Sequence, residues 1–205
     1  MPTHPIGRHV TVSRLAASIT VLLCATVSAA QAQEPSLTPE LQAVRDGLEQ
    51  YRDPIRAIYD GYLSTVGCIA YPEGGTEGTM SYPAGGMGVH FLNMSFVGPE
   101  LDPTKPQVLI YVPDGDELRL VAAEWFMPAE LAGDNRPTIF GHELQGPMEG
   151  HKPLMPAGMH HLDLHVWLWE ENPAGVFSPT NPAVSCPASA YSFNESAPNM
   201  VEHGH

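Results

Sequence analysis

The segment HHLDLHVWLW at 160–169 carries the side chains best suited to chemistry. On a strand, successive side chains point to opposite faces, so His161, Asp163 and His165 would share one face and the leucines the other. A neutral imidazole offers a lone pair, and two imidazoles on one strand face can begin a transition-metal site. The pattern indicates a candidate metal site; the alternative is a polar groove in which these side chains hydrogen-bond to their neighbours.

Two further residues could supply ligands from elsewhere in the chain. His90 lies within GVHFLN, and Glu124 lies within LRLVAAEWF, on a face shared with Leu118, Leu120, Ala122 and Phe126. A carboxylate among apolar side chains is costly to bury unless it is paired or bound to a cation. The alternatives are an ordinary core histidine at position 90 and, for Glu124, a partner such as Arg136 or simple exposure.

The combination of His90, Glu124, His161 and His165 has the ligand types of a cupin-like site for one divalent transition metal, Zn or Cu first, with Mn and Fe as further possibilities. The separation of His161 and His165 along the strand argues against both of them binding one ion. Four residues of straight strand separate two Cα atoms by about 13 Å, which is long for two ligands on one ion. Either a bend brings His161 and His165 together, or Asp163 replaces one of them, or Asp163 orients an imidazole from behind.

A second group of possible ligands lies in the segment MEGHKPLMPAGMHH. Thioethers are soft ligands that Cu(I) favours, while imidazole suits both copper states. The alternative is that the methionines fill irregular gaps between loops. The group consists of Met148, His151, Met155, Met159 and His160, and the C-terminal His203 and His205 would chelate weakly or lie in a disordered end.

Other classes of function have less support from the sequence. There is no G-x-S-x-G motif, no P-loop and no G-x-G-x-x-G followed by a helix, so enzymatic activity is left open and the sequence leans against it. A small apolar ligand could occupy a cavity in the β region. A structural or interaction protein of the cell envelope would need no chemical site. The aromatic side chains that could line such a cavity are Tyr111, Trp125, Phe126, Trp167 and Trp169.

The elements that must position these residues are predicted to be of two kinds. Thr38-Pro39 and Asp53-Pro54 are helix-start signals, so we expect a helical segment over 33–64, formed by two helices or by one kinked helix. Strands are predicted at 88–96, 107–112, 117–127 and 160–169, within a β-rich part at 65–190. The predicted class is α+β, with an antiparallel β-barrel or β-sandwich, and 191–205 is predicted to be a flexible tail.

The N-terminus has the organisation of a secretory signal peptide over 1–32. Basic residues precede an apolar run at 15–30, which is followed by an A-x-A cleavage site. Leu23 before Cys24 argues against lipid attachment, so no membrane anchor is expected after cleavage. The mature chain would be secreted or periplasmic, and in that oxidising compartment Cys68 and Cys186 are predicted to form a disulfide.

The charge of the chain argues against some classes of binding partner. Nine Lys and Arg stand against 23 Asp and Glu, a formal net charge of −14 at pH 7, and cleavage would remove Arg8 and Arg14 as well. Nucleic acids and anionic membranes need clustered basic residues, so neither is an expected partner. A metal ion or a small molecule is the expected partner, and the oligomeric state stays open.

Several stretches together resemble a family of uncharacterised secreted bacterial proteins. The matching stretches are Asp60-Gly61-Tyr62, GMGVHFLN, LDPTKPQVLIYVPDGDELRLVAAEWFMP, GPMEGH and HHLDLHVWLWEENPAGVFSPTNPAVSC. They cover most of residues 60–186, and their combination is specific although no single short motif is. The resemblance implies the domain boundaries and an extracytoplasmic location, and it implies no reaction, cofactor or catalytic residue.

Overall fold

A computed structural model describes Met1 and residues 35–64, 67–77, 80–150, 158–186 and 192–194. The chain divides into two units, Met1–Gln31 and Ala32–His205, and the described helices and strands belong to the second. The predicted signal peptide, apart from Met1, lies outside the described residues. Among the described residues, no helix is long and apolar enough to span a bilayer.

The helical segment forms as two short helices joined by a 3-10 turn. Helix α1 (Pro39–Leu48) begins at Thr38, whose side chain accepts a hydrogen bond from the Leu41 amide at 3.3 Å. The 3-10 turn η1 (Glu49–Arg52) leads to Asp53, which caps α2 (Pro54–Tyr59) through the Ile55 amide at 2.9 Å. The buried side chains of α1 recur at helical spacing and give it one apolar face.

Eight strands form the main sheet, in the order β10-β11-β7-β6-β5-β2-β12, with β1 also pairing with β5. The pairs are antiparallel except for β12 with β2. These strands are β1 (Leu63–Ser64), β2 (Cys68–Tyr71), β5 (Gly85–Leu92), β6 (Val108–Asp114), β7 (Glu117–Pro128), β10 (Gln145–Glu149), β11 (His160–Val166) and β12 (Ser192–Asn194).

Smaller elements connect these strands. Two hairpins stand apart from the main sheet, β3 (Gly75–Glu77) with β4 (Met80–Tyr82) and β8 (Thr138–Ile139) with β9 (His142–Glu143). Two short helical turns complete the described elements, η2 (Met94–Phe96) and α3 (Ala129–Ala132). The α+β class is confirmed. The expected barrel is not closed among the described strands, because their order remains open between β10 and β12.

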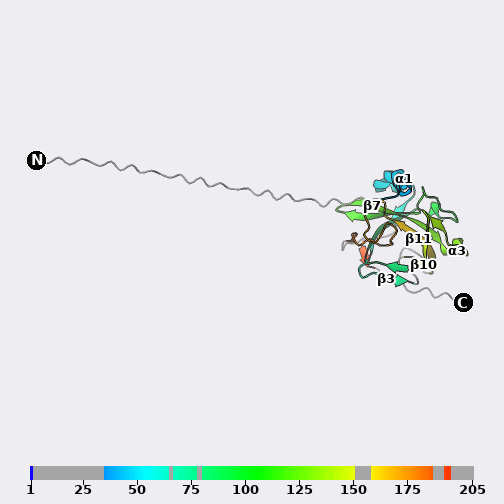
Figure 1. The fold of residues 1–205 in the computed structure, drawn as a ribbon. Helices are drawn as coiled ribbons and strands as arrows, with labels where there is room; N and C mark the ends of the chain where they lie inside the picture. Colours follow the sequence, from blue (N-terminus) through cyan, green and yellow to red (C-terminus); the bar gives the residue numbers. More distant parts are fainter. Residues whose placement is uncertain (2–34, 65–66, 78–79, 151–157, 187–191, 195–205) are drawn as a thin grey trace. The chain divides into compact units, whose positions relative to one another are not determined.

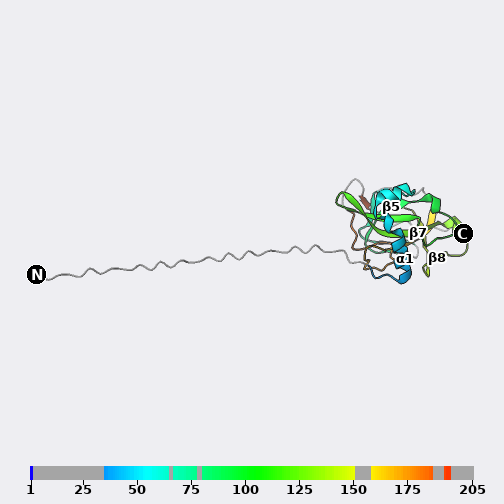
Figure 2. The same cartoon turned by 90° about the horizontal axis from the view of Figure 1, so that it is seen from above.

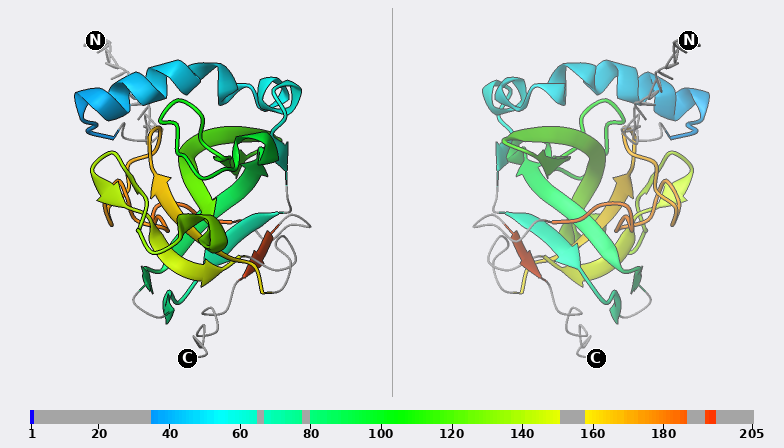
Figure 3. Two further views of the ribbon diagram at one scale, coloured as in Figure 1. Left: turned by 90° about the vertical axis from the view of Figure 1, so that its right-hand side faces the viewer. Right: turned by 90° about the vertical axis from the view of Figure 1, so that its left-hand side faces the viewer.

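The two faces of the main sheet have different coverings. On one face the apolar side of α1 packs against residues such as Phe91, Leu109, Trp125 and Leu164. Helix α1 lies beside β7 in two perpendicular views (Figures 1 and 2), and Figure 3 shows the helical segment lying across the strands. We call this the helix face. The opposite face, which we call the polar face, carries a second apolar cluster that includes Val108, Ile110 and Trp167, and it also carries the candidate ligands.

A β-bulge decides which side chains of β7 reach the polar face. Ile110 pairs with Ala122 while Tyr111 pairs with Leu120, so Val121 is an extra residue on β7. Leu120 consequently packs on the helix face, whereas Ala122 packs on the polar face. The expectation that Glu124 shares a face with Leu120 is therefore wrong, since the bulge interrupts the alternation between them.

Four stretches differ from the expected pattern. No strand is predicted between 65 and 87 or between 128 and 159, yet the first stretch contains the β3–β4 hairpin and the second contains β10. Strand β11 ends at Val166 and not at Trp169, and Trp169 lies on the helix face, where its indole N–H donates to Glu49 at 3.0 Å. Within the segment predicted as a tail, residues 192–194 form β12 beside β2.

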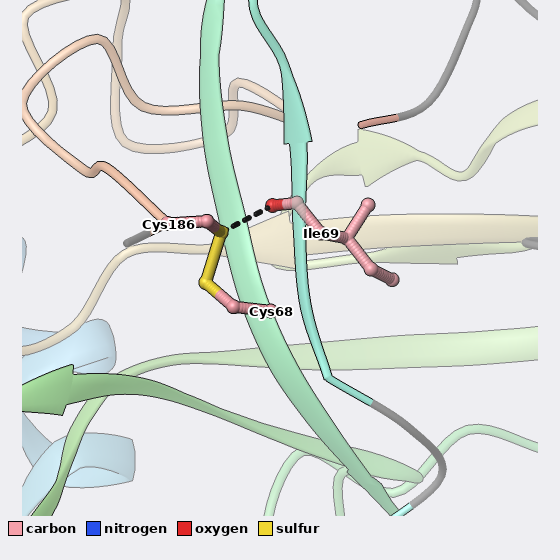
Figure 4. The surroundings of a disulfide bond; sticks show 3 residues. All are labelled: Cys68, Ile69 and Cys186. Carbon is pink, nitrogen blue, oxygen red and sulfur yellow. Dashed lines mark hydrogen bonds between the residues drawn. A yellow bond between two sulfur atoms is a disulfide. The ribbon is translucent and has the colours of Figure 1, made fainter. Parts of the chain in front are cut away.

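The predicted disulfide joins β2 to the C-terminal segment. Cys68 and Cys186 are bonded, with Cα atoms 5.5 Å apart and 118 positions between them in the sequence. Figure 4 shows the bond, with Cys186 Sγ lying 3.1 Å from the carbonyl oxygen of Ile69. The same segment pairs with β5, where the Gly86 amide donates to the Asn181 carbonyl at 3.1 Å. The sulfur bridge and this backbone pairing together fasten the segment to the sheet.

Candidate metal centre

Three strands position the five candidate ligands on the polar face. Glu124 on β7 is the register partner of His165 on β11, so the two side chains project side by side. His90 on β5 is separated from β7 by β6, where it pairs with Ile110. The side chain of His90 therefore reaches Glu124 across the polar face of β6.

The first group of ligands is centred on one oxygen of Glu124. Its Oε2 lies 3.5 Å from His90 Nε2 and 3.6 Å from His165 Nε2. The two imidazole rings meet nearly edge to face, with centroids 6.0 Å apart and an interplanar angle of 80°. One ligand atom from each of the three residues lies within 4.8 Å of the others, so the three residues could hold one metal ion.

The second group shares Glu124 with the first. Its other members are His161 and Asp163, and again the three ligand atoms lie within 4.8 Å of one another. His161 Nε2 lies 3.3 Å from Asp163 Oδ2, while Asp163 Oδ1 lies 3.5 Å from His165 Nδ1. The two oxygens of Asp163 therefore face different imidazoles, and Asp163 connects the two groups.

All five side chains are buried, with between 1% and 7% of their surface exposed. Burial, together with the Asp163 carboxylate, raises the pKa of Glu124 to about 7, against the opposing effect of the nearby imidazoles. Burial also disfavours ionisation of Asp163, yet His165 and His161 outweigh it and hold the pKa of Asp163 well below its ordinary value. Burial opposes the charged form of His165, but Glu124 and Asp163 outweigh it and raise its pKa.

Several polar atoms in this cluster have no hydrogen-bond partner among the described residues. They include Glu124 Oε2, Asp163 Oδ1, His161 Nδ1 and both ring nitrogens of His165. A buried polar atom without a partner is destabilising, and native structures contain few of them. Such atoms on ligand-type side chains form a cluster that could hold a metal ion.

The structure brings together all five residues that the sequence singled out, but it arranges them as two groups of three that share Glu124. The long spacing between His161 and His165 is accommodated in this way, since each belongs to a different group. The proposed partnership of Glu124 with Arg136 is wrong. Arg136 instead donates to the carbonyl oxygens of Leu144 and Gly146, at 3.0 and 2.8 Å.

One neighbour of the cluster was missed by sequence reasoning. Gln145 on β10 is the register partner of Asp163, and its Oε1 is buried without a hydrogen-bond partner among the described residues. Its Nε2 donates to the carbonyl of Phe177 at 3.3 Å. No sequence signal pointed to Gln145, because the Gly146-Pro147 pair beside it is typical of a loop.

The methionine and histidine group is only partly described. Met148 is buried on β10, where its sulfur accepts a hydrogen bond from the Tyr82 hydroxyl and packs against Met80 and Met87. This packing fits the gap-filling role of methionine. Met159 is exposed and His160 is half-buried. The remaining candidates lie outside the described residues: His151, Met155, His203 and His205.

The five aromatic residues considered for an apolar ligand are divided between the two faces. Tyr111, Trp125 and Trp169 belong to the cluster under the helices, whereas Trp167 packs on the polar face. Phe126 lies against the His161 ring, with centroids 5.0 Å apart. All five are buried, so they fill the interior on both sides of the sheet.

Comparison with protein-family models, with curated proteins and with solved structures gives no match. Function is therefore inferred from the chemistry of the buried cluster.

Proposed function

We propose that this chain binds a divalent transition metal ion, Zn or Cu, through His90, Glu124 and His165. The observation that carries the proposal is the pair of distances from Glu124 Oε2 to the two imidazole nitrogens, 3.5 and 3.6 Å. These distances are long for hydrogen bonds. Two ligand atoms about 2.1 Å from a tetrahedral ion are about 3.4 Å apart, so the spacing fits two edges of one coordination sphere.

Asp163 supports this assignment, because it faces the ring nitrogen of His165 that points away from Glu124. A metal-bound imidazole usually donates its other N–H to a carboxylate, which fixes the tautomer and the ring orientation. His165 directs Nε2 toward Glu124 and Nδ1 toward Asp163 Oδ1, at 3.5 Å. The two nitrogens therefore face the two sides that a carboxylate–histidine–metal arrangement requires, with Nδ1 and Oδ1 separated by more than a normal hydrogen-bond distance.

The types of ligand limit which metal ions the site could bind. Two imidazoles and one carboxylate suit Zn, Cu(II), Mn and Fe, and the absence of a thiolate or thioether from this set argues against Cu(I). Three protein ligands leave at least one coordination position for water or a small molecule. The disulfide is typical of oxidising compartments, and we place this metal-binding protein outside the cytoplasm on that basis.

The proposal is tested by removing metal with a chelator and titrating the chain with Zn, with bound metal measured after gel filtration. His165→Ala should lower the affinity by at least a hundredfold, since it removes a ligand. His142→Ala is the matched control, because His142 is exposed and belongs to neither group of ligands. Failure of the unmodified chain to retain metal, or equal affinity in His165→Ala, would refute the proposal.

A further inference from the structure

We infer that the cluster holds two metal ions, with Glu124 as the shared ligand, the second ion being bound by His161 and Asp163. This inference rests on the proposed function for the first ion. Its starting point is that the five side chains form two groups of three, each with ligand atoms within 4.8 Å of one another, and that only Glu124 belongs to both. Carboxylates commonly bridge paired ions about 3.5–4 Å apart.

The two oxygens of Asp163 allow it to serve both positions. Oδ1 faces His165 Nδ1 at 3.5 Å and orients the imidazole of the first site. Oδ2 faces His161 Nε2 at 3.3 Å, close to the separation of about 3.4 Å between two ligands on one tetrahedral ion. One carboxylate can therefore orient a ligand of the first ion and bind the second.

His161 has coordination capacity that the first site does not use. Its Nδ1 is buried and has no hydrogen-bond partner within the described parts of the chain, although its other nitrogen faces Asp163. Burying a ring nitrogen in that condition is costly. A second ion beside Asp163 would bind Nε2, the nitrogen that faces the Asp163 carboxylate, and Nδ1 would then carry the ring proton.

Gln145 adds a neutral oxygen on the same side of the cluster. It is paired with Asp163 across β10 and β11, and its Oε1 has no hydrogen-bond partner in the described residues. An amide oxygen is an ordinary ligand for hard divalent ions. The second position is thus bordered by Glu124, His161, Asp163 and Gln145.

The charges of the site also indicate which further ligands the two ions would bind. Two divalent ions bring four positive charges, and the carboxylates of Glu124 and Asp163 offset two of them. A water molecule that loses a proton to solvent supplies a bridging hydroxide, because coordination to two ions lowers the pKa of bound water. The surplus positive charge that remains would attract a small anion to the open positions.

Stoichiometry tests the inference directly. The chain is purified without a histidine tag and with His203→Ala and His205→Ala, so that the terminal imidazoles do not add weak sites. After chelation and reloading, we expect two Zn per chain, one in His161→Ala and one in His90→Ala. Glu124→Ala should lose both tight sites, because it removes the shared ligand.

A spectroscopic measurement on the chain with its cluster intact does not depend on whether a variant folds. Two Cu(II) ions bridged by a carboxylate couple magnetically, so the loaded chain should show an electron paramagnetic resonance signal much weaker than its copper content. In His161→Ala the signal should match the copper content. One ion per chain with a full-intensity signal would overturn the paired site and leave the proposed function standing, whereas no bound metal would overturn both.

Discussion

The helix face and the polar face of the main sheet are made by alternate residues of the same strands, yet they are stabilised differently. On the helix face, side chains such as Leu164 and Trp125 are buried against apolar neighbours, and the Trp125 N–H donates to the Asp102 carbonyl at 2.9 Å. On the polar face, Glu124 and His165 are equally buried, but atoms of both lack hydrogen-bond partners among the described residues. The comparison teaches that equal burial does not mean equal satisfaction of polar atoms, since only the polar face buries side-chain atoms of Glu124 and His165 without hydrogen-bond partners among the described residues.

The largest effect is expected at the disulfide, which fastens the C-terminal segment to β2 of the main sheet. Replacing Cys68 and Cys186 together by Ser should lower the free energy of unfolding by about 4–5 kcal/mol, since the disulfide closes a loop of more than a hundred residues. Urea unfolding of the oxidised protein and the variant measures the difference. Equal midpoints in the two proteins would show that the backbone pairing at Gly86 suffices to hold the C-terminal segment.

The comparison of the faces is tested most directly by two neighbouring substitutions on β11. Leu164 and His165 are each 1% exposed and point to opposite faces. In the presence of chelator, Leu164→Ala should cost about 2–5 kcal/mol through the cavity that it leaves. His165→Ala should cost less, because it also removes ring nitrogens whose burial without partners costs about 1–3 kcal/mol.

Thermal or urea unfolding under the same conditions gives both values. A loss from His165→Ala as large as that from Leu164→Ala would mean that the polar face stabilises the fold through contacts of its own, and the distinction between the faces would fail.

Bound metal should raise the contribution of the polar face to the stability of the folded chain. At a free Zn concentration one hundred times the dissociation constant, binding should stabilise the folded chain by about 2.7 kcal/mol. The gain should be lost in Glu124→Gln, which keeps the size of the side chain but removes the charge shared by both groups of ligands. Leu164→Ala should keep the gain. Unfolding midpoints of the unmodified chain, Glu124→Gln and Leu164→Ala, each measured with and without Zn, give the stability gained from the metal. An equal gain in Glu124→Gln and the unmodified chain would contradict the expectation.

A further effect concerns the dependence of stability on pH. The pKa of Glu124 is raised to about 7, so the folded chain without metal keeps a proton there that the unfolded chain releases near 4.5. Stability of the chelated chain should therefore fall as pH rises from about 4.5 to 7, and Glu124→Gln should show a smaller fall, since Asp163 still raises the pKa of His165. Urea unfolding of both chains at pH 5, 6 and 7 measures the slope, and parallel profiles would contradict the expectation.

Metal binding should have the opposite dependence on pH. A metal ion competes with the Glu124 proton, so Zn affinity should weaken below about pH 7, by roughly tenfold per pH unit for each proton displaced. Isothermal titration calorimetry at pH 6 and pH 8 in two buffers measures both affinity and proton release. An affinity that is equal at the two pH values, with no proton released, would contradict competition between the metal and a proton on Glu124.

The sequence was sufficient to predict what depends on short spacing. The alternation in 160–166 placed His161, Asp163 and His165 on one face, because the side-chain period of a strand is two. The helix starts at Thr38 and Asp53 followed from local capping chemistry. The disulfide followed from the cysteine count and the expected compartment.

Features that depend on pairing between distant segments could not be predicted. That β11 pairs with β7, and that His90 reaches across β6, is decided by strand order, which local patterns do not encode. Gln145 was missed for the same reason, since it gains its significance only opposite Asp163. The separation of the ligands into two groups required the register of all these strands together.

The extra residue at Val121 makes the cluster sensitive to chain length as well as to residue type. Every side chain of β7 beyond the bulge owes its face to that one insertion, and the Val121 carbonyl also accepts a hydrogen bond from the Trp169 amide at 3.1 Å. Deleting Val121 would leave every candidate ligand in the sequence, yet it would direct Glu124 toward the helices and Trp125 toward the imidazoles. Among related chains, a gap of one residue at this place would therefore mark a protein that has kept the ligands and lost the site.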